Sequence, residues 1–290
     1  MKNPVFTGTC TALVTPFING EINYPMAEQL LRRQMDNGIS AVVLAGTTGE
    51  SATLSDIEKI TLFKRCKKFC GDQCTIIAST GSNSTEHAIT LSIAAEKAGA
   101  DALLVVSPYY NKSTADGLIA HYLSIATAVN IPIILYNVPT RTGVDIPIEV
   151  YRQLAAVPNI AGVKEACTNI TKVAHIRNEC PRDFYVWSGN DDQIVPTIAL
   201  GGSGVISVLS NIFPRETERM LQCALSNDFD AASAMQCEFL PLIDLLFCEV
   251  NPIPVKAAMK MIGYDCGQCR LPLVDLTRSN RKKLEAYFKR

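Results

Sequence analysis

The chain carries at positions 160–166 the sequence Ile160-Ala161-Gly162-Val163-Lys164-Glu165-Ala166, a short apolar run with a lysine near its end. Strands buried on both faces of a parallel sheet are nearly continuous apolar runs, so this stretch is predicted to be such a strand. A lysine at its carboxyl end must either reach water or be desolvated, which favours the neutral amine. Because a neutral amine can attack a ketone and form a Schiff base, Lys164 is the first candidate catalytic residue.

Similar apolar runs recur along the chain and alternate with amphipathic segments. The eight predicted strands are Cys10–Thr15, Ile39–Gly46, Cys74–Thr80, Ala100–Ser107, Ile131–Asn137, Ile160–Glu165, Phe184–Ser188 and Gly204–Leu209. Helix signals separate them, among them the capping box that Ser55 and Glu58 form before an apolar stripe. Repeated βα units without a Gly-rich turn after the first strand predict an α/β fold, a closed (β/α)8 TIM barrel.

The strand pattern stops after Asn227. The remaining sequence is predicted to form two or three helices, interrupted at Asn251-Pro252-Ile253-Pro254 and at Gly263. Since this segment is small for an independent domain, we expect a catalytic barrel at 1–227 and a C-terminal helical extension at 228–290 that packs on it.

Composition and charge exclude several classes of protein. With 290 residues, 48% of them hydrophobic, and a net charge of -1, the chain has no electrostatic signature for nucleic acid or for an anionic membrane. The N-terminus lacks the apolar region of a signal peptide, and no segment approaches the roughly 20 apolar residues of a membrane span. A cytoplasmic protein is therefore expected.

Eleven cysteines are present, but their number is odd and their spacing is scattered. Two local groups, Cys66 with Cys70 and Cys74, and Cys266 with Cys269, lack a second ligand pair at zinc-site spacing. We therefore expect reduced thiols that serve mostly as small core residues, and no metal.

In a TIM barrel, the chemistry lies at the carboxyl ends of the strands. Those ends hold Gly46-Thr47-Thr48-Gly49-Glu50, Ser79-Thr80-Gly81, Pro108-Tyr109-Tyr110-Asn111, residues 136–143, Lys164-Glu165, Ser188-Gly189-Asn190-Asp191 and Ser207. They are rich in hydroxyl groups and include one strand-end lysine, whereas all three histidines, His87, His121 and His175, fall in helical stretches. This distribution favours metal-free amine catalysis over a metal-dependent aldolase or hydrolase.

Three of these motifs resemble those of the dihydrodipicolinate synthase and N-acetylneuraminate lyase family, in the same order and at matching separations. They are Gly46-Thr47-Thr48-Gly49-Glu50, Tyr136-Asn137-Val138-Pro139-Thr140-Arg141-Thr142-Gly143 and Gly162-Val163-Lys164-Glu165. The Thr-Thr pair and the Arg-Thr-Gly ending are similar to the dihydrodipicolinate synthase branch, and the resemblance covers essentially the whole chain.

The resemblance implies condensation of pyruvate with aspartate 4-semialdehyde to a cyclic precursor of dipicolinate and lysine, without a cofactor. Lys164 would form the Schiff base, and Tyr136 would move protons through Thr47 to Tyr110, which a neighbouring subunit would supply. Thr48 would hold the pyruvate carboxylate and Arg141 that of the semialdehyde. Gly189 and Ile206 would also bind substrate. The family further implies a homotetramer built from two dimers.

The resemblance also points to a regulatory lysine site at a dimer interface. Its positions here are Ser51, Ala52, Asp56, Lys59, Asn83, His87 and Tyr109. Lysine-sensitive members have a glutamate where this chain has His87, and a neutral side chain is common where it has Lys59. We therefore expect weak or no inhibition by lysine.

Purely structural roles are the alternatives for these residues. Lys164 could be a structural ion-pair partner, Tyr136 and Tyr110 could be packing residues, and Arg141 could bind protein carboxylates only. Glu50 and Glu165 are predicted to be structural and to accept loop N–H groups. At the level of function, the alternatives are a related sugar-acid aldolase and a non-catalytic protein that binds a keto acid.

Overall fold

The computed structural model describes residues 2–289, and its central feature is a closed barrel of eight parallel strands. The strands are β1 (Gly8–Ala12), β4 (Ala41–Leu44), β5 (Thr75–Ser79), β6 (Ala102–Val106), β7 (Ile133–Asn137), β8 (Ile160–Glu165), β9 (Tyr185–Ser188) and β10 (Gly204–Ser207). Each pairs with the next along the chain, and β10 closes on β1. The predicted TIM barrel is confirmed.

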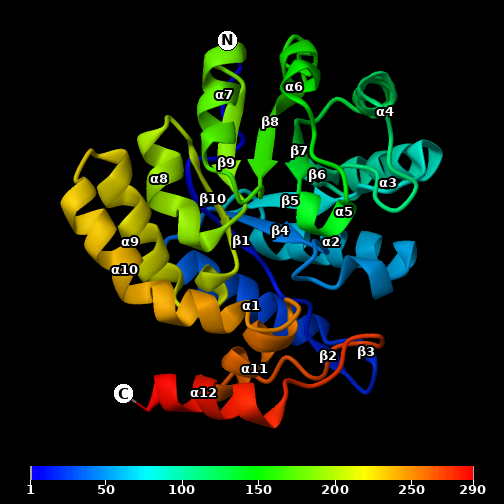
Figure 1. The fold of residues 1–290 in the computed structure, drawn as a ribbon. Coiled ribbons are helices and arrows are strands. Elements are labelled where there is room, and N and C mark those ends of the chain that lie inside the picture. The colour runs from blue at the N-terminus through cyan, green and yellow to red at the C-terminus, as the bar shows by residue number, and fades with distance from the viewer. Residues whose placement is uncertain (1, 290) are drawn as a thin grey trace.

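Helices surround the barrel on its outer face (Figure 1). They are α1 (Tyr24–Asp36), α2 (Asp56–Cys70), α3 (Thr85–Lys97), α4 (Ala115–Ala128), α6 (Ile148–Leu154), α7 (Thr171–Glu179), α8 (Ile194–Ala199) and α9 (Pro214–Leu225). The short helix α5 (Pro139–Thr142) and the 3-10 turns η1 (Ser51–Thr53), η2 (Asp191–Gln193) and η3 (Leu209–Asn211) lie in the segments that follow β7, β4, β9 and β10. The predicted capping box opens α2, with the Ser55 hydroxyl and the Glu58 carboxylate each bonding the other's backbone N–H.

Side-chain alternation along each strand divides the apolar residues into two cores. In β4, Ala41 and Val43 face the barrel interior, whereas Val42 and Leu44 pack against the helices. The interior cluster also holds Trp187 and Ile206, so the barrel is filled rather than hollow. Only the ends of the strands are left to form a site.

The C-terminal segment consists of three helices, α10 (Phe229–Leu246), α11 (Ile253–Met261) and α12 (Arg278–Phe288). The predicted boundary at 227 falls between α9 and α10, and a division into two separate units there stays a prediction. Figure 1 shows α11 and α12 at one end of the barrel, on the side toward which the arrows of β7 and β8 point.

A small hairpin of β2 (Phe17–Ile18) and β3 (Glu21–Ile22) was not predicted. Its turn is Asn19-Gly20, with φ of 52° and 82°, and Asn-Gly between apolar residues is a strong sequence signal for such a turn. The hairpin lies beside the C-terminal segment, where the Phe17 N–H donates to the Cys266 carbonyl at 2.9 Å.

All eleven cysteines are free, and six of them are buried. Burial raises the pKa of Cys66, Cys74 and Cys266 to about 12, so these groups are neutral thiols that pack like small apolar side chains. Among the helices of residues 2–289, none combines the length and the apolar character that crossing a membrane requires.

Candidate active site

Lys164 and Tyr136 are paired residues on neighbouring strands. The register of β7 and β8 places Tyr136 opposite Lys164, so both side chains point into the barrel, and the Lys164 Nζ lies 4.4 Å from the centre of the Tyr136 ring. Both residues are buried, with exposed fractions of 6% and 7%. A buried amine is thus held against an aromatic face.

Strand alternation also explains why Glu165, the next residue, faces away from this amine. Glu165 points outward, where it accepts hydrogen bonds from the Asn137 amide at 2.7 Å and the Tyr151 hydroxyl at 3.0 Å. Its carboxylate also accepts the Cys167 N–H at 2.8 Å. Burial raises the pKa of Glu165, and these donors oppose that shift. The contacts agree with the structural role predicted for Glu165.

Gly162 lies at an irregularity of β8 and in close contact with the neighbouring strand β9. The register between β7 and β8 shifts at Ile133 and Ile134, where Ile134 pairs with Gly162. A Cβ at Gly162 would lie 2.0 Å from the Tyr185 carbonyl oxygen on β9. Glycine is therefore needed for the close approach of β9, two residues before Lys164.

A cavity of 170 Å³ at the carboxyl ends of the strands brings most of the predicted site residues together. Its lining includes Thr47, Thr48, Tyr136, Arg141, Lys164 and Gly189. These residues come from the ends of β4, β7, β8 and β9, the arrangement expected for a TIM-barrel site.

Two predicted residues lie elsewhere in this single chain. Tyr110 is 92% exposed, with a φ of 69°, and is not part of the cavity lining. Ile206 is fully buried in the barrel interior and does not line the cavity either. The large, exposed side chain of Tyr110 is available to contact a neighbouring molecule.

Arg141 lies at the exposed mouth of the cavity, at the end of α5. One guanidinium nitrogen donates to the Asn251 carbonyl at 3.2 Å. Within residues 2–289, no carboxylate lies within ion-pair distance of this guanidinium. Arg141 therefore keeps donors that a bound anion could use.

The C-terminal segment supplies cavity residues that the sequence interpretation missed. Phe247 and Asn251 line the cavity, and the Asn251 amide donates to the Thr48 hydroxyl at 3.0 Å. The Asn251 Oδ1 is buried, and the described residues give it no hydrogen-bond partner. From the sequence, Asn251 was expected to interrupt the C-terminal helices and to belong to a tail similar to that of the dihydrodipicolinate synthase branch, but it was given no role in the site. The polar residue before Pro252 was the available signal.

The residues predicted as a regulatory site lie around the start of α2 and α3. His87 Nε2 is 2.8 Å from Asp56 Oδ2, and His87 Nδ1 is 3.1 Å from the Ser82 hydroxyl. Lys59 is buried, and burial lowers its pKa, while Asp56 opposes that shift. The Asn83 carbonyl accepts from the Asn111 amide at 2.9 Å.

Asp145, Glu165 and Cys167 bring their donor atoms within 4.8 Å of one another. Both carboxylates in this group have other partners: Lys172 pairs with Asp145, and Asn137 with Glu165. The group is thus explained by the packing around β8, and we assign it no metal.

Comparisons with known proteins point to one family. A sequence profile of the Dihydrodipicolinate synthetase family matches residues 5–290. The 4-hydroxy-tetrahydrodipicolinate synthase of Acetivibrio thermocellus is 45% identical over 289 residues, which cover 100% of this chain and 98% of that protein. A crystal structure of dihydrodipicolinate synthase from Cyanidioschyzon merolae with lysine bound is 40% identical, with a TM-score of 0.96 and coverage of 99% and 98%. A structure of a monomeric dihydrodipicolinate synthase variant is 39% identical, with a TM-score of 0.96 and coverage of 98% and 96%.

Proposed function

Because this chain belongs to the Dihydrodipicolinate synthetase family, we propose that Lys164 forms a Schiff base with pyruvate and so drives its condensation with aspartate 4-semialdehyde. The product is 4-hydroxy-tetrahydrodipicolinate, a precursor of diaminopimelate and lysine, and the enzyme is a lyase of the class I aldolase type. The observation that carries the assignment of Lys164 is its buried Nζ, 4.4 Å from the Tyr136 ring at the wall of the cavity.

The reaction needs an amine that is neutral when it attacks and protonated when it leaves. The Lys164 amine adds to the ketone carbon of pyruvate, and loss of one water gives an imine that draws electrons from the methyl group. The methyl carbon then loses a proton and attacks the aldehyde carbon of the semialdehyde. The amino group of the semialdehyde attacks the imine carbon, which closes the ring and releases Lys164. No external cofactor is required.

Each of these steps requires a proton transfer, and we assign proton transfer to the Tyr136 hydroxyl. A phenol is a poor base at neutral pH, so it requires a hydroxyl partner through which protons can pass. Thr47 lines the same cavity and is the proposed partner. Tyr110 of a neighbouring subunit would complete the relay.

The exposure of Tyr110 supports this use of a second subunit. A tyrosine that is 92% exposed beside the 40% exposed Tyr109 forms an apolar projection that a partner could cover. We infer a homo-oligomer, a tetramer made of two dimers. A molar mass by light scattering that corresponds to a monomer, together with full activity of the same sample, would contradict this oligomeric state.

The substrate carboxylates have two proposed binding groups. Thr48, a buried residue of the cavity lining, would hold the carboxylate of pyruvate, and the exposed guanidinium group of Arg141 at the mouth would hold that of the semialdehyde. This order places the first substrate deepest, next to Lys164. The second substrate then closes the site from outside.

Borohydride reduction in the presence of pyruvate tests the proposal. We expect an irreversible adduct on Lys164, which peptide mass spectrometry would locate, and loss of activity in proportion to labelling. If no adduct formed, every Schiff-base function, including a sugar-acid aldolase, would be excluded, and only a non-catalytic keto-acid-binding protein would remain. Turnover of aspartate 4-semialdehyde separates the synthase from such an aldolase.

We predict that Arg141→Ala lowers kcat/KM for aspartate semialdehyde by roughly 10- to 100-fold, the loss expected for a charge-assisted hydrogen bond. Borohydride trapping of pyruvate should change much less, because Arg141 lies at the mouth rather than at Lys164. Arg152→Ala, which removes an exposed arginine on α6, is the matched control. Equal losses in both measurements would show that Arg141 holds the architecture instead.

We predict that free lysine, at concentrations that inhibit regulated relatives, leaves this enzyme nearly fully active. The ligand carries two ammonium groups, and Lys59 adds a like charge that costs on the order of 1–4 kcal/mol at a few ångströms. The nearby anion, Asp56, is already bonded to His87 at 2.8 Å. Initial rates across a lysine titration test this. Strong inhibition that Asp56→Asn removes would show that Asp56 recruits the ligand.

We further infer a cytoplasmic location. The eleven free thiols support it, because an oxidising compartment would favour their pairing.

A further inference from the structure

Glu50 ends the threonine loop, which we define as residues 46–50, and its carboxylate is completely buried. Its side chain has an exposed fraction of 0%, and its backbone is left-handed, with a φ of 59°. The carboxylate contacts the C-terminal segment: Oε1 accepts from Lys256 Nζ on α11, and Oε2 accepts from the Arg270 N–H, both at 2.8 Å. A loop that supplies two proposed site residues is thus tied to a segment more than 200 residues later.

The ammonium group of Lys256 is also isolated from water. Its side chain is 4% exposed, and its other contacts are the Gln268 carbonyl at 3.3 Å and the face of the Phe17 ring at 4.5 Å. Two charges in such surroundings require each other, because water is not available to replace either partner. The pair therefore fixes the separation between α11 and the threonine loop.

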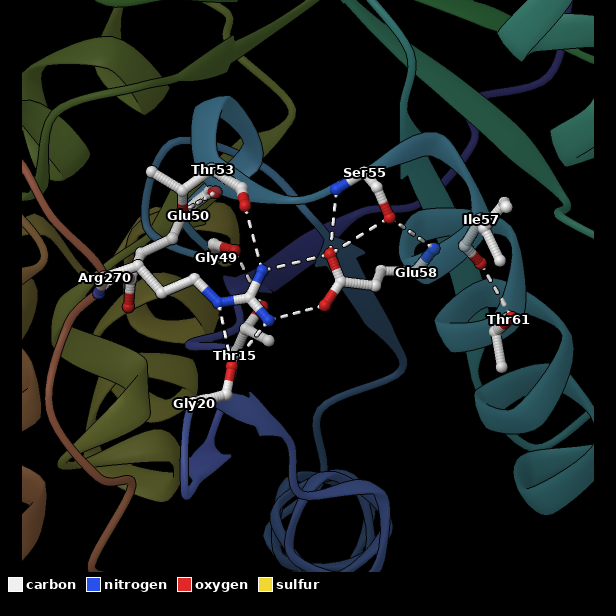
Figure 2. A network of polar contacts seen from close by, with 10 residues as sticks. All are labelled: Thr15, Gly20, Gly49, Glu50, Thr53, Ser55, Ile57, Glu58, Thr61 and Arg270. Carbon is white, nitrogen blue, oxygen red and sulfur yellow. Dashed lines mark hydrogen bonds and ion pairs between the residues drawn. The ribbon is translucent and has the colours of Figure 1, made fainter.

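The side chain of Arg270 holds the next part of the chain, as Figure 2 shows. Its guanidinium donates to both carboxylate oxygens of Glu58, to the Thr53 carbonyl at 2.9 Å and to the Gly20 carbonyl at 2.7 Å. The hydrogen bond from Arg270 is the main reason that the pKa of Glu58 falls to about 2. These hydrogen bonds of Arg270 join the start of α2 and the β2–β3 hairpin to the C-terminal segment that also contacts Glu50.

Hydrogen bonds within and beside the threonine loop link the position of Glu50 to that of Thr47 and Thr48. The Glu50 N–H donates to the Thr47 carbonyl at 3.1 Å, and the Gly49 carbonyl accepts from the Thr15 hydroxyl at 2.7 Å. Gly49 has no room for a side chain without strain, since a Cβ would lie 3.1 Å from the backbone of Ala45. A displacement of Glu50 therefore has to move Thr47 and Thr48.

We propose that Glu50 and Lys256 are positioning residues for the reaction: their buried ion pair sets where Thr47 and Thr48 stand relative to Lys164. Neither residue lines the cavity. The proposal rests on the function assigned above, in which Thr48 holds the pyruvate carboxylate and Thr47 belongs to the proton relay.

The test compares Glu50→Gln, Lys256→Met and the double variant. Each single change leaves a buried group without its partner and should lower the melting temperature, whereas the double change removes both charges and should recover most of it. Activity should not recover with stability. We expect the double variant to trap pyruvate with borohydride roughly 10²-fold more slowly, the order expected for a site group misplaced by about 1 Å. The KM for pyruvate should rise more than the KM for the semialdehyde.

Two further variants make the comparison decisive. Lys260 lies on α11, as Lys256 does, and forms an exposed ion pair with Asp265, so Lys260→Met should leave all rates unchanged. Glu50→Asp keeps the charge but shortens the side chain by one methylene, so it should fold and still raise the KM for pyruvate. This variant serves if the double variant does not fold.

The outcomes are distinct from those that test the function. If the wild-type enzyme forms no adduct with pyruvate, the proposed function fails, and the positioning role that rests on it fails too. If the wild-type enzyme is trapped normally, and the double variant or Glu50→Asp is trapped at the wild-type rate, the pair is merely structural. Parallel increases in both KM values would also overturn the positioning role.

Discussion

Replacing Lys164 with methionine is expected to abolish borohydride trapping of pyruvate and to reduce turnover by roughly 10⁴-fold or more, the order seen when a covalent nucleophile is removed. Methionine has a similar length and suits a position that is 6% exposed, so the barrel should remain folded. The loss would then report the chemistry. Trapping followed by intact-protein mass spectrometry, together with steady-state turnover, provides the measurement.

Lys172→Met is the matched control for this variant. Lys172 is also a buried lysine near an aromatic ring, with its Nζ 5.7 Å from the centre of Tyr151, but it lies on α7 outside the cavity. Its loss should lower stability, because Asp145 loses an ion-pair partner, and should leave the pyruvate adduct intact. A Lys164→Met enzyme that still formed the adduct would remove Lys164 from the mechanism.

Tyr136→Phe is expected to lower kcat by roughly 10²- to 10⁴-fold, the range for a positioned proton-transfer group. Phenylalanine retains the ring face that lies 4.4 Å from the Lys164 Nζ, so the amine should keep its place. The variant therefore removes the hydroxyl and little else. Steady-state turnover and the rate of imine formation, measured by quenched borohydride reduction, check the prediction.

Tyr151→Phe separates this effect from the loss of any buried hydroxyl. The Tyr151 hydroxyl donates to Glu165 at 3.0 Å on the helix side of β8, so its removal should cost about 1 kcal/mol of stability with little change in turnover. If Tyr136→Phe were as active as Tyr151→Phe, proton transfer in the cavity would have to be assigned to another group.

Much of this fold could be predicted because its signals are local. The eight predicted strands overlap the eight observed strands, although their ends differ. The predicted strand Ile39–Gly46, for example, is longer than the observed β4 (Ala41–Leu44). The last residues of that predicted strand leave the sheet because the backbone turns at Ala45, which has a φ of 50° and directly precedes the threonine loop. The hairpin at 17–22 was missed although its Asn19-Gly20 turn was visible in the sequence.

The alternation of strands and helices can be predicted from the amino-acid sequence, and with it the barrel and the strand end at which Lys164 lies. These features follow from periodicity within a few residues, which each segment carries on its own. Which groups meet at the strand ends depends instead on the packing of distant segments. The tertiary structure brought Asn251 to Thr48 across 203 residues and Lys256 to Glu50 across 206, and it left Tyr110 outside the cavity. Such pairings depend on how the C-terminal helices pack on the barrel, and no local pattern encodes a contact between segments so far apart in the chain.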